Sequence, residues 1–275
     1  MARIKFQLIF LALLFYQRNV KAESRPVERI INGFHASPKQ FPYQVLLNRL
    51  IDTEWEPLCG GVIISKRIIL TAAHCIKDEL NVIKIYFGAV DRSNIKEPGQ
   101  QRLIVKRNNF VVHPEWEFSQ LINDIALIKL PADLQFDEYI QPAKLPDPTE
   151  LYNDVSGVVS GWGIASVQGF IPSQLQYYNV SVLSNEECKS IKLKYEPRTF
   201  FPSSWICIKP SERTPCSGDS GGPFVKRNED GSSTLLGVAS FGIDDDCSFN
   251  IPTVYTRVSS FLSWIEKYDT KYNYV

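Results

Sequence analysis

The sequence lacks an excess of either charge, and this lack limits its partners. Across 275 residues, 30 lysines and arginines balance 30 aspartates and glutamates. Proteins that bind nucleic acid usually carry a basic surface, and no local run of basic residues supplies one here. We therefore expect no nucleic-acid partner. The 44% apolar content is typical of an ordinary globular chain and argues against a disordered protein.

Long apolar runs are also missing. The stretch Phe6–Tyr16 is too short to cross a bilayer, because a membrane-spanning helix needs about 20 residues. Arg3 and Lys5 precede this stretch, and small residues ending at Ala22 follow it. This arrangement predicts a secretory signal peptide over residues 1–22, and with it a secreted, extracellular protein that has no membrane anchor.

Histidines are few, and no two cysteines form a Cys-x-x-Cys pair. His35, His74 and His113 never fall at the spacing of metal ligands, so we expect no metal ion and no cofactor. The six cysteines all follow the signal segment, and their even number predicts three disulfides in an oxidising compartment. Six cysteines allow fifteen pairings, and their positions alone do not choose among them.

Short runs of β-branched and aromatic residues fill the chain from residue 42 onward, separated by Gly, Pro, Asn and Asp. This pattern predicts an all-β sandwich or barrel. The runs form two series, with a proline-rich connector at 141–149 between them. We therefore predict two β halves, at about 30–145 and 150–258. A helical spacing of apolar residues then predicts a docked C-terminal helix over about 259–269.

Ser220 lies in a glycine-rich segment, Gly218-Asp219-Ser220-Gly221-Gly222. Small neighbours allow a sharp turn whose amide groups can point at a developing oxyanion. A Gly-x-Ser-x-Gly sequence is also typical of the nucleophile turn of α/β-hydrolases, but that fold needs a histidine after the serine. No histidine follows His113, so that fold is excluded. The other interpretation is a glycine-rich turn whose serine has no catalytic role.

A base for Ser220 must come earlier in the chain. His74 follows the apolar run Ile68–Leu70, so a strand would deliver it, although a lone histidine at a strand end is more often structural. Asp124 precedes a run that looks buried on both faces. A carboxylate entering a core needs a partner, and a histidine N–H would serve. Seen alone, Asp124 is better explained as a turn or capping residue.

With His74, Asp124 and Ser220 in this order, the sequence resembles the chymotrypsin-like (trypsin-fold, S1) serine protease family. Within that family it most resembles invertebrate chymotrypsin-like digestive proteases. The resemblance covers about residues 30–270. It implies two six-stranded antiparallel β-barrels with a C-terminal α-helix. The motifs that carry it are Ile30-Ile31-Asn32-Gly33, Thr71-Ala72-Ala73-His74-Cys75, Asp124-Ile125-Ala126-Leu127, Ser160-Gly161-Trp162-Gly163, Gly218-Asp219-Ser220-Gly221-Gly222-Pro223 and Ser240-Phe241-Gly242.

The resemblance implies catalytic roles. Ser220 would be the nucleophile of a serine endopeptidase, and His74 its general base and then its general acid. Asp124 would orient His74 and stabilise the imidazolium. The N–H groups of Gly218 and Ser220 would form the oxyanion hole. Ser240 would donate a hydrogen bond that supports Asp124.

Four residues are expected to bind the substrate. Ser240 and Gly242 would line the strand that pairs with the substrate backbone. Counting back from Cys216 places Thr214 at the base of the primary specificity pocket, where Arg- and Lys-specific members carry aspartate. Because Thr214 is uncharged, the bottom of the pocket disfavours a cationic side chain. Thr253, on the opposite wall, narrows the pocket. We expect cleavage after Phe, Tyr, Leu or Met, with an elastase-like preference for smaller residues as the alternative.

The resemblance also implies a zymogen. Residues 23–29 would be an activation propeptide, and a cut between Arg29 and Ile30 would release the protease domain at 30–275. The new α-ammonium would pair with Asp219, because an unpaired buried carboxylate beside the nucleophile is costly. Since the enzyme's own pocket would lack an acid, a different, Arg-specific protease would make this cut.

Other partners and the disulfides follow from the same resemblance. We expect protein or peptide substrates and protein inhibitors of proteases as partners, no membrane, and a monomer. The short propeptide favours a stand-alone digestive protease. The expected disulfides are Cys59–Cys75, Cys188–Cys207 and Cys216–Cys247.

Two alternatives stay open at this point. A catalytically inactive family homologue would act as a binding protein, but members of that class usually lose the serine. A subtilisin-like enzyme would use Asp52, His74 and Ser220 in that order. The all-β pattern and the cysteine framework do not fit that α/β fold.

Overall fold

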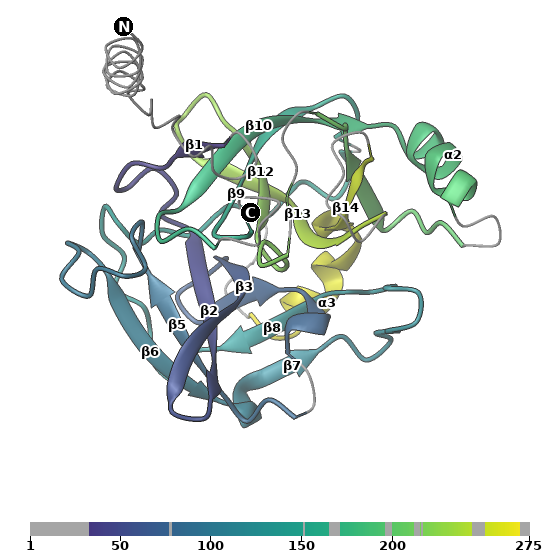
Figure 1. Ribbon diagram of the computed structural model, residues 1–275. Helices are drawn as coiled ribbons and strands as arrows, with labels where there is room; N and C mark the ends of the chain where they lie inside the picture. The colour runs from purple at the N-terminus through teal and green to yellow at the C-terminus, as the bar shows by residue number, and fades with distance from the viewer. Residues whose placement is uncertain are drawn as a thin grey trace, which may run out of the picture.

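The chain forms two β-barrels that pack against each other, one below the other in Figure 1. Apart from β1, the first half of the chain builds the lower barrel and the second half the upper one. The predicted all-β fold is confirmed. This computed structural model describes residues 33–76, 79–150, 152–164, 171–195, 200–211, 215, 217–243 and 251–269.

The first barrel closes because one stretch of chain borders both edges of its sheet. The strand order is β6-β5-β2-β3-β4-β8-β7, with antiparallel neighbours throughout. Only the 3-10 turn Arg107–Asn109 separates β6 from β7, so the two act as one interrupted strand. The strands are β2 (Gln44–Ile51), β3 (Glu54–Ile63), β4 (Ile68–Thr71), β5 (Val82–Phe87), β6 (Gln101–Lys106), β7 (Phe110–Val112) and β8 (Ala126–Lys129).

The second barrel closes by direct pairing. Its order is β1-β10-β11-β14-β13-β12-β9, and β10 also pairs with β9, so six strands form a ring to which the short β1 adds. The strands are β1 (Phe34–His35), β9 (Ser156–Gly161), β10 (Gln176–Leu183), β11 (Trp205–Ile208), β12 (Pro223–Arg227), β13 (Ser233–Gly242) and β14 (Thr253–Arg257).

The residue pattern explains which strands face water. In β10, Tyr178, Val180 and Val182 point into the barrel, whereas Asn179 between them is exposed. This alternation follows from the two-residue period of a strand. All of β4 and the second half of β3, residues 59–63, are buried. This burial on both faces explains why these segments lack alternating polar residues. Their apolar residues belong to a hydrophobic cluster that also includes Val225, Leu235 and Val238 of the second barrel.

Two helices complete the described chain. α2 (Asn185–Tyr195) stands beside the second barrel, with acidic residues in its first turn and lysines in its last, as the helix dipole favours. At the C-terminus, the 3-10 turn Val258–Phe261 leads into α3 (Leu262–Glu266), which is shorter than the expected 259–269. The apolar residues of α3 pack in one hydrophobic cluster with those of the first barrel, so α3 ties the two barrels together. None of the helices in the described part of the chain combines the length and the apolar character that crossing a membrane requires.

Candidate active site

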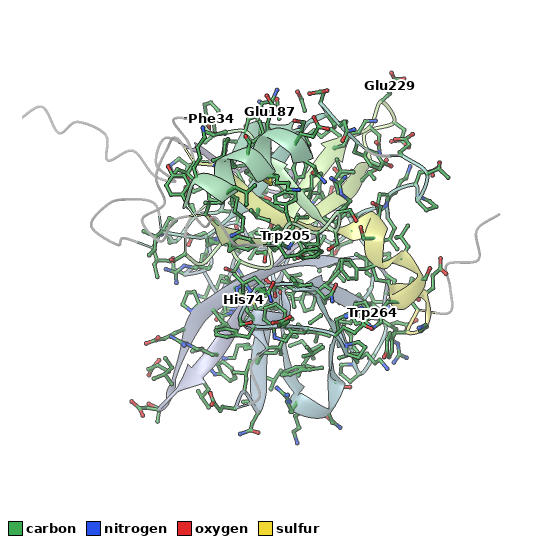
Figure 2. The ribbon with its side chains drawn as sticks, turned by 90° about the vertical axis from the view of Figure 1, so that its right-hand side faces the viewer. Phe34, His74, Glu187, Trp205, Glu229 and Trp264 are labelled. Carbon is green, nitrogen blue, oxygen red and sulfur yellow. A yellow bond between two sulfur atoms is a disulfide. The ribbon has the colours of Figure 1, made fainter. Side chains whose placement is uncertain are left out.

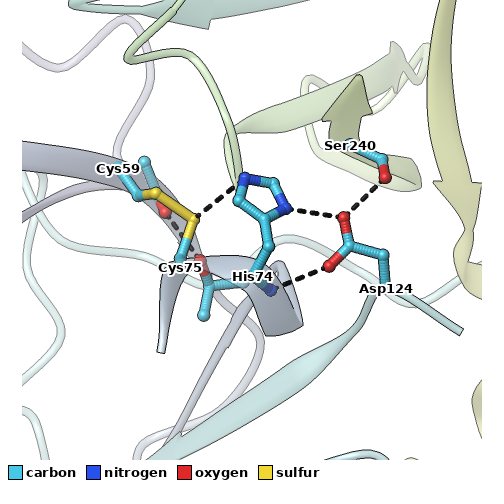
Figure 3. The surroundings of a disulfide bond; sticks show 7 residues. Cys59, His74, Cys75, Asp124 and Ser240 are labelled. Carbon is cyan, nitrogen blue, oxygen red and sulfur yellow. Dashed lines mark hydrogen bonds and ion pairs between the residues drawn. A yellow bond between two sulfur atoms is a disulfide. The ribbon is translucent and has the colours of Figure 1, made fainter. Parts of the chain in front are cut away.

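Neighbouring strands of the first barrel bring His74 and Asp124 together. β4 ends at Thr71 and leads into the 3-10 turn Ala73–Cys75, which carries His74. Asp124 stands just before β8, the strand that pairs with β4. His74 Nδ1 lies 2.7 Å from Asp124 Oδ2, and the His74 backbone N–H donates to Asp124 Oδ1 at 2.9 Å (Figure 3). His74 therefore engages both oxygens of the carboxylate.

The second barrel completes the environment of Asp124, which is fully buried. Ser240 Oγ, on β13, donates a hydrogen bond of 2.5 Å to Asp124 Oδ2. Thr256 Oγ1, on β14, donates to the Asp124 carbonyl oxygen at 2.8 Å. Buried charge is costly unless hydrogen bonds replace the lost water, and these donors replace it. Sequence reasoning missed Thr256, because nothing in the sequence of β14, Thr-Val-Tyr-Thr-Arg, singles this threonine out.

The same contacts determine the protonation of the imidazole. A carboxylate accepts only, so Nδ1 of His74 carries the proton that points to Asp124. Nε2 of a neutral ring is then left with a lone pair, as a general base requires. The ring is partly exposed, and Nε2 lies 3.8 Å from Cys75 Sγ. The arrangement can therefore accept a proton at Nε2 and stabilise the resulting positive charge.

Ser220 lies on a turn that packs against the first barrel. Its carbonyl oxygen accepts the Gly60 N–H at 2.8 Å. Gly218 and Gly221 have φ of +101° and +74°, which L residues rarely adopt. A Cβ on Gly221 would also lie 2.6 Å from the Gly60 carbonyl oxygen. The glycines therefore let this turn of the second barrel approach β3 closely.

Among the described residues, Ser220 Oγ makes no hydrogen bond to His74. Such bonds are often long in enzymes without substrate and shorten when substrate binds. The structure thus joins His74, Asp124 and Ser240 by direct hydrogen bonds. Ser220 belongs to the second barrel, and the hydrogen bond from the Gly60 N–H to its carbonyl oxygen holds it against the first.

Asp219 is buried next to the turn that carries Ser220. Its Oδ1 accepts the Gly163 N–H at 2.8 Å. A Cβ on Gly161 or Gly163 would collide with this carboxylate, which explains the glycines of the Ser-Gly-Trp-Gly motif. A small cavity of about 10 Å³ adjoins Asp219. Burial above all, and then the charge of Asp219, raises the pKa of Tyr255 in its wall well above the usual range. The other lining residues are Val159, Ser160, Gly161, Tyr178, Pro215 and Gly222.

Two of the three expected disulfides lie in the described chain. Cys59–Cys75 fixes the turn that carries His74, and Cys188–Cys207 ties α2 to β11. Cys216 and Cys247 lie outside the described residues, so their pairing stays a prediction. Sulfur atoms of Cys59 and Cys75 lie near the His74 ring, but a disulfide supplies no thiolate to bind a metal ion.

The residues expected to bind substrate lie only partly within the described chain. Thr253, at the start of β14, is buried and stands opposite Gly242 of β13 in the sheet register. Gly242 is exposed. Thr214, Arg29 and Ile30 lie outside the described residues, and their roles stay predictions.

Known proteins are similar to this chain over most of its length. A family model described as Trypsin matches residues 30–265. The collagenase of Hypoderma lineatum is 35% identical over 243 residues, covering 87% of this chain and 86% of that protein. Human chymotrypsin-like elastase family member 3B is 34% identical over 255 residues, covering 89% and 90%. The serine proteinase stubble of Drosophila melanogaster is 36% identical over 250 residues, and the match covers 88% of this chain but only 31% of that longer protein.

A solved structure shows the same fold. The structure of HL collagenase superposes with a TM-score of 0.74 at 32% sequence identity, covering 87% of this chain and 98% of that one. These matches confirm the resemblance predicted from the motifs. The catalytically inactive homologue and the subtilisin-like fold are not favoured. The chain belongs to the trypsin family of serine endopeptidases.

Proposed function

We propose that this endopeptidase is made as an inactive precursor and cuts peptide bonds through Ser220, His74 and Asp124 by way of an acyl-enzyme. The observation that supports this most is the buried Asp124, which binds His74 through both carboxylate oxygens and accepts a third hydrogen bond from Ser240. A structural histidine needs no such support for its tautomer. A general base does, because its Nε2 lone pair must stay available.

The proposed reaction begins with a proton transfer. Nε2 of His74 takes the hydroxyl proton of Ser220 as Oγ attacks the substrate carbonyl carbon. Asp124 stabilises the imidazolium that forms. The imidazolium then gives its proton to the leaving amine, and the peptide bond breaks to leave an ester on Ser220. Water attacks this ester with the same base, which releases the acid product and restores Ser220.

The N–H groups of Gly218 and Ser220 are proposed to bind the oxyanion of each tetrahedral intermediate. Hydrogen-bond donors that are already in place stabilise the charge that develops there. The positive φ of Gly218 supports this role. A Cβ on Gly218 would also lie 3.1 Å from Gly163 Cα, so a larger residue would displace the turn.

Activation is proposed to require a cut after Arg29. The buried Asp219 supports this step, because a carboxylate away from water is a strong partner for an incoming α-ammonium group. Ile30 would bring that group. Pairing there would fix the turn from Gly218 to Ser220 in its working conformation.

The proposed substrates are proteins cut after bulky apolar residues. The buried Thr253 is neutral, which supports the prediction that a basic residue is not favoured at this position. Its β-branched side chain also supports the alternative, a preference for small residues. The similarity to a protein named chymotrypsin-like elastase suits both choices.

The proposed location is extracellular, and the protein is proposed to act as a monomer. The disulfides of the described chain support an oxidising compartment. Its other partners would be a separate Arg-specific activating protease and protein inhibitors.

The test compares Ser220→Ala with the wild-type protein. The full chain is purified with its disulfides, treated with trypsin to cut after Arg29, and assayed on peptide substrates. We expect Ser220→Ala to lose about 10⁴-fold or more in kcat, because the three residues act as a unit. Ser263→Ala, at an exposed serine on α3, is the matched control and should keep full activity. Near-normal turnover by Ser220→Ala would overturn the proposal.

A further inference from the structure

α2 carries a lysine whose side chain lies inside the protein. Lys192 is only 4% exposed, whereas Lys194 on the same helix is exposed. Lysine is almost never fully buried unless its ammonium group gains compensating interactions. The proposed mechanism does not use this residue, so its burial requires another explanation.

Two aromatic rings face the ammonium group. Lys192 Nζ lies 5.1 Å from the ring centroid of Phe241 and 5.6 Å from that of Trp205. Both distances are within the range in which a cation is attracted to a ring face, and the attraction is stronger away from water. The two rings also contact each other edge to face, with centroids 5.1 Å apart. The lysine and the two rings therefore form one packed unit.

This unit stands on a rigid base. Cys188 lies one turn before Lys192 on α2 and is bonded to Cys207 of β11, two residues after Trp205. Phe201 packs edge to face against Trp205, with ring centroids 5.3 Å apart. In the view of Figure 2, Trp205 appears between α2, marked by Glu187, and His74 of the first barrel. These contacts anchor Trp205, which in turn faces the ammonium group.

Phe241 is the point at which this unit touches the proposed substrate-binding strand. The pairing of β13 with β14 shifts register between Ala239 and Phe241, so Ser240 has no partner in that ladder. Such a bulge re-aims side chains but weakens the local pairing. Ser240 is then anchored through Asp124 on one side. On the other side, the half-buried Phe241 is anchored by Lys192 and Trp205.

We propose that Lys192 is a positioning residue, whose buried ammonium group holds Phe241 and thereby fixes the bulged segment Ser240–Gly242 that pairs with the backbone of an extended substrate. This inference rests on the proposed function, because it assumes that the segment binds substrate. It assigns no chemical step to Lys192. Its loss should therefore weaken binding of long substrates and leave the chemistry on short ones unchanged.

The test uses two substrates with the same residue before the cut. One is a tetrapeptide amide, which can pair with Ser240–Gly242, and the other is an ester of the single amino acid, which cannot. Lys192→Met keeps the length and apolar volume of the side chain but removes the charge. We expect KM for the tetrapeptide to rise about tenfold with kcat changed less than about twofold, and no change for the ester.

Matched variants separate positioning from general damage. Lys192→Arg should restore the tetrapeptide KM, and Lys194→Met, at the exposed lysine of the same helix, should leave both substrates unchanged. Phe241→Leu should raise the tetrapeptide KM by itself, and adding Lys192→Met to it should have little further effect. If Lys192→Met does not fold, the selective effect of Phe241→Leu and rescue of KM in Lys192→Arg decide the question.

Equal losses on both substrates, or an unchanged tetrapeptide KM in Lys192→Met, would overturn the inference. So would additive effects of Lys192→Met and Phe241→Leu. Failure of the proposed function is recognised separately, because the wild-type protein would then hydrolyse neither substrate in a manner that depends on Ser220.

Discussion

Ser240 Oγ of the second barrel donates a 2.5 Å hydrogen bond to Asp124 Oδ2 of the first, the same oxygen that faces His74 Nδ1. One carboxylate oxygen thus joins the proposed base to the strand proposed to bind substrate. Thr256 adds a second link from β14 to the backbone of Asp124. Two polar contacts across the seam between the barrels therefore converge on one buried residue.

Ser240→Ala should weaken catalysis without unfolding the protein. The change removes one of three donors to a buried carboxylate, and a lost hydrogen bond to a charged group costs about 1.5–3 kcal/mol. We expect kcat/KM to fall about tenfold or more. Steady-state kinetics on one peptide substrate, with active sites counted by a serine-directed reagent, measure this.

Thr256→Val is the matched control for Ser240→Ala. It removes a donor to the Asp124 carbonyl oxygen but leaves the carboxylate contacts in place. We expect the melting temperature to fall more than kcat/KM. A Ser240→Ala protein with wild-type kcat/KM would show that the hydrogen bond from Ser240 to Asp124 does not contribute to catalysis.

Arg29→Gln should give a protein that stays inactive when trypsin is added. Without a basic residue the activating cut is not made, and no α-ammonium group is created at Ile30 to pair with Asp219. N-terminal sequencing of the wild-type protein should show Ile30 as the first residue only in active samples. Full activity from uncut Arg29→Gln would contradict the zymogen mechanism, while leaving the role of Ser220 untouched.

His113 should make the protein less stable in acid. Its ring packs 5.2 Å from Phe261 and 5.0 Å from Trp264, between the first barrel and the C-terminal segment. Burial is the main cause that lowers the pKa of His113. Lys267 lowers it further, and Glu115 opposes the shift. A folded-state pKa below the unfolded value of about 6.5 means that the unfolded chain takes up the proton first as pH falls.

The stability that neutral His113 contributes is therefore present above about pH 6.5 and is lost as pH falls through the folded-state pKa. His113→Phe keeps an aromatic ring against Phe261 and Trp264, but the new side chain does not titrate. We expect the melting temperature to fall less between pH 7.5 and pH 5 in this variant than in the wild-type protein. The backbone N–H of residue 113 still donates to Ile125. Identical pH profiles would refute this prediction.

Sequence motifs predicted those site residues whose positions depend only on the neighbouring segment of chain. His74 follows a short apolar strand, and Asp124 precedes another, so each residue's position could be inferred from its own neighbours. The glycines around Ser220 likewise signal a turn that only small residues allow. The family resemblance then supplied the relation between these segments, and with it the disulfides Cys59–Cys75 and Cys188–Cys207.

The remainder depends on contacts between distant segments. α2 was not predicted because its polar sequence has no clear apolar face, and the disulfide of Cys188 holds it in place instead. The burial of Lys192 requires Trp205 and Phe241 from two different strands. Thr256 reaches Asp124 only because the two barrels meet there. No local pattern encodes such contacts, since burial of a polar side chain is decided by what packs against it.

The choice of bond is the last prediction. Thr253 is buried and neutral opposite Gly242, and Thr214, which lies outside the described residues, is neutral in the sequence. A lysine or arginine side chain would meet no carboxylate from either residue, and burying an unpaired cation is costly. We expect matched peptides with Phe or Leu before the cut to be hydrolysed fastest, Ala more slowly and Arg slowest.

Thr253→Gly tests which residue limits the pocket. Removing a β-branched side chain should widen it, so the ratio of kcat/KM for Phe over Ala should rise by about tenfold. A wild-type protein that prefers Ala, together with this rise, would establish the elastase-like alternative and assign it to Thr253. An Arg peptide hydrolysed fastest would contradict the prediction. It would show that the acidic run Asp244, Asp245 and Asp246, which lies outside the described residues, recruits a basic side chain despite the neutral threonines.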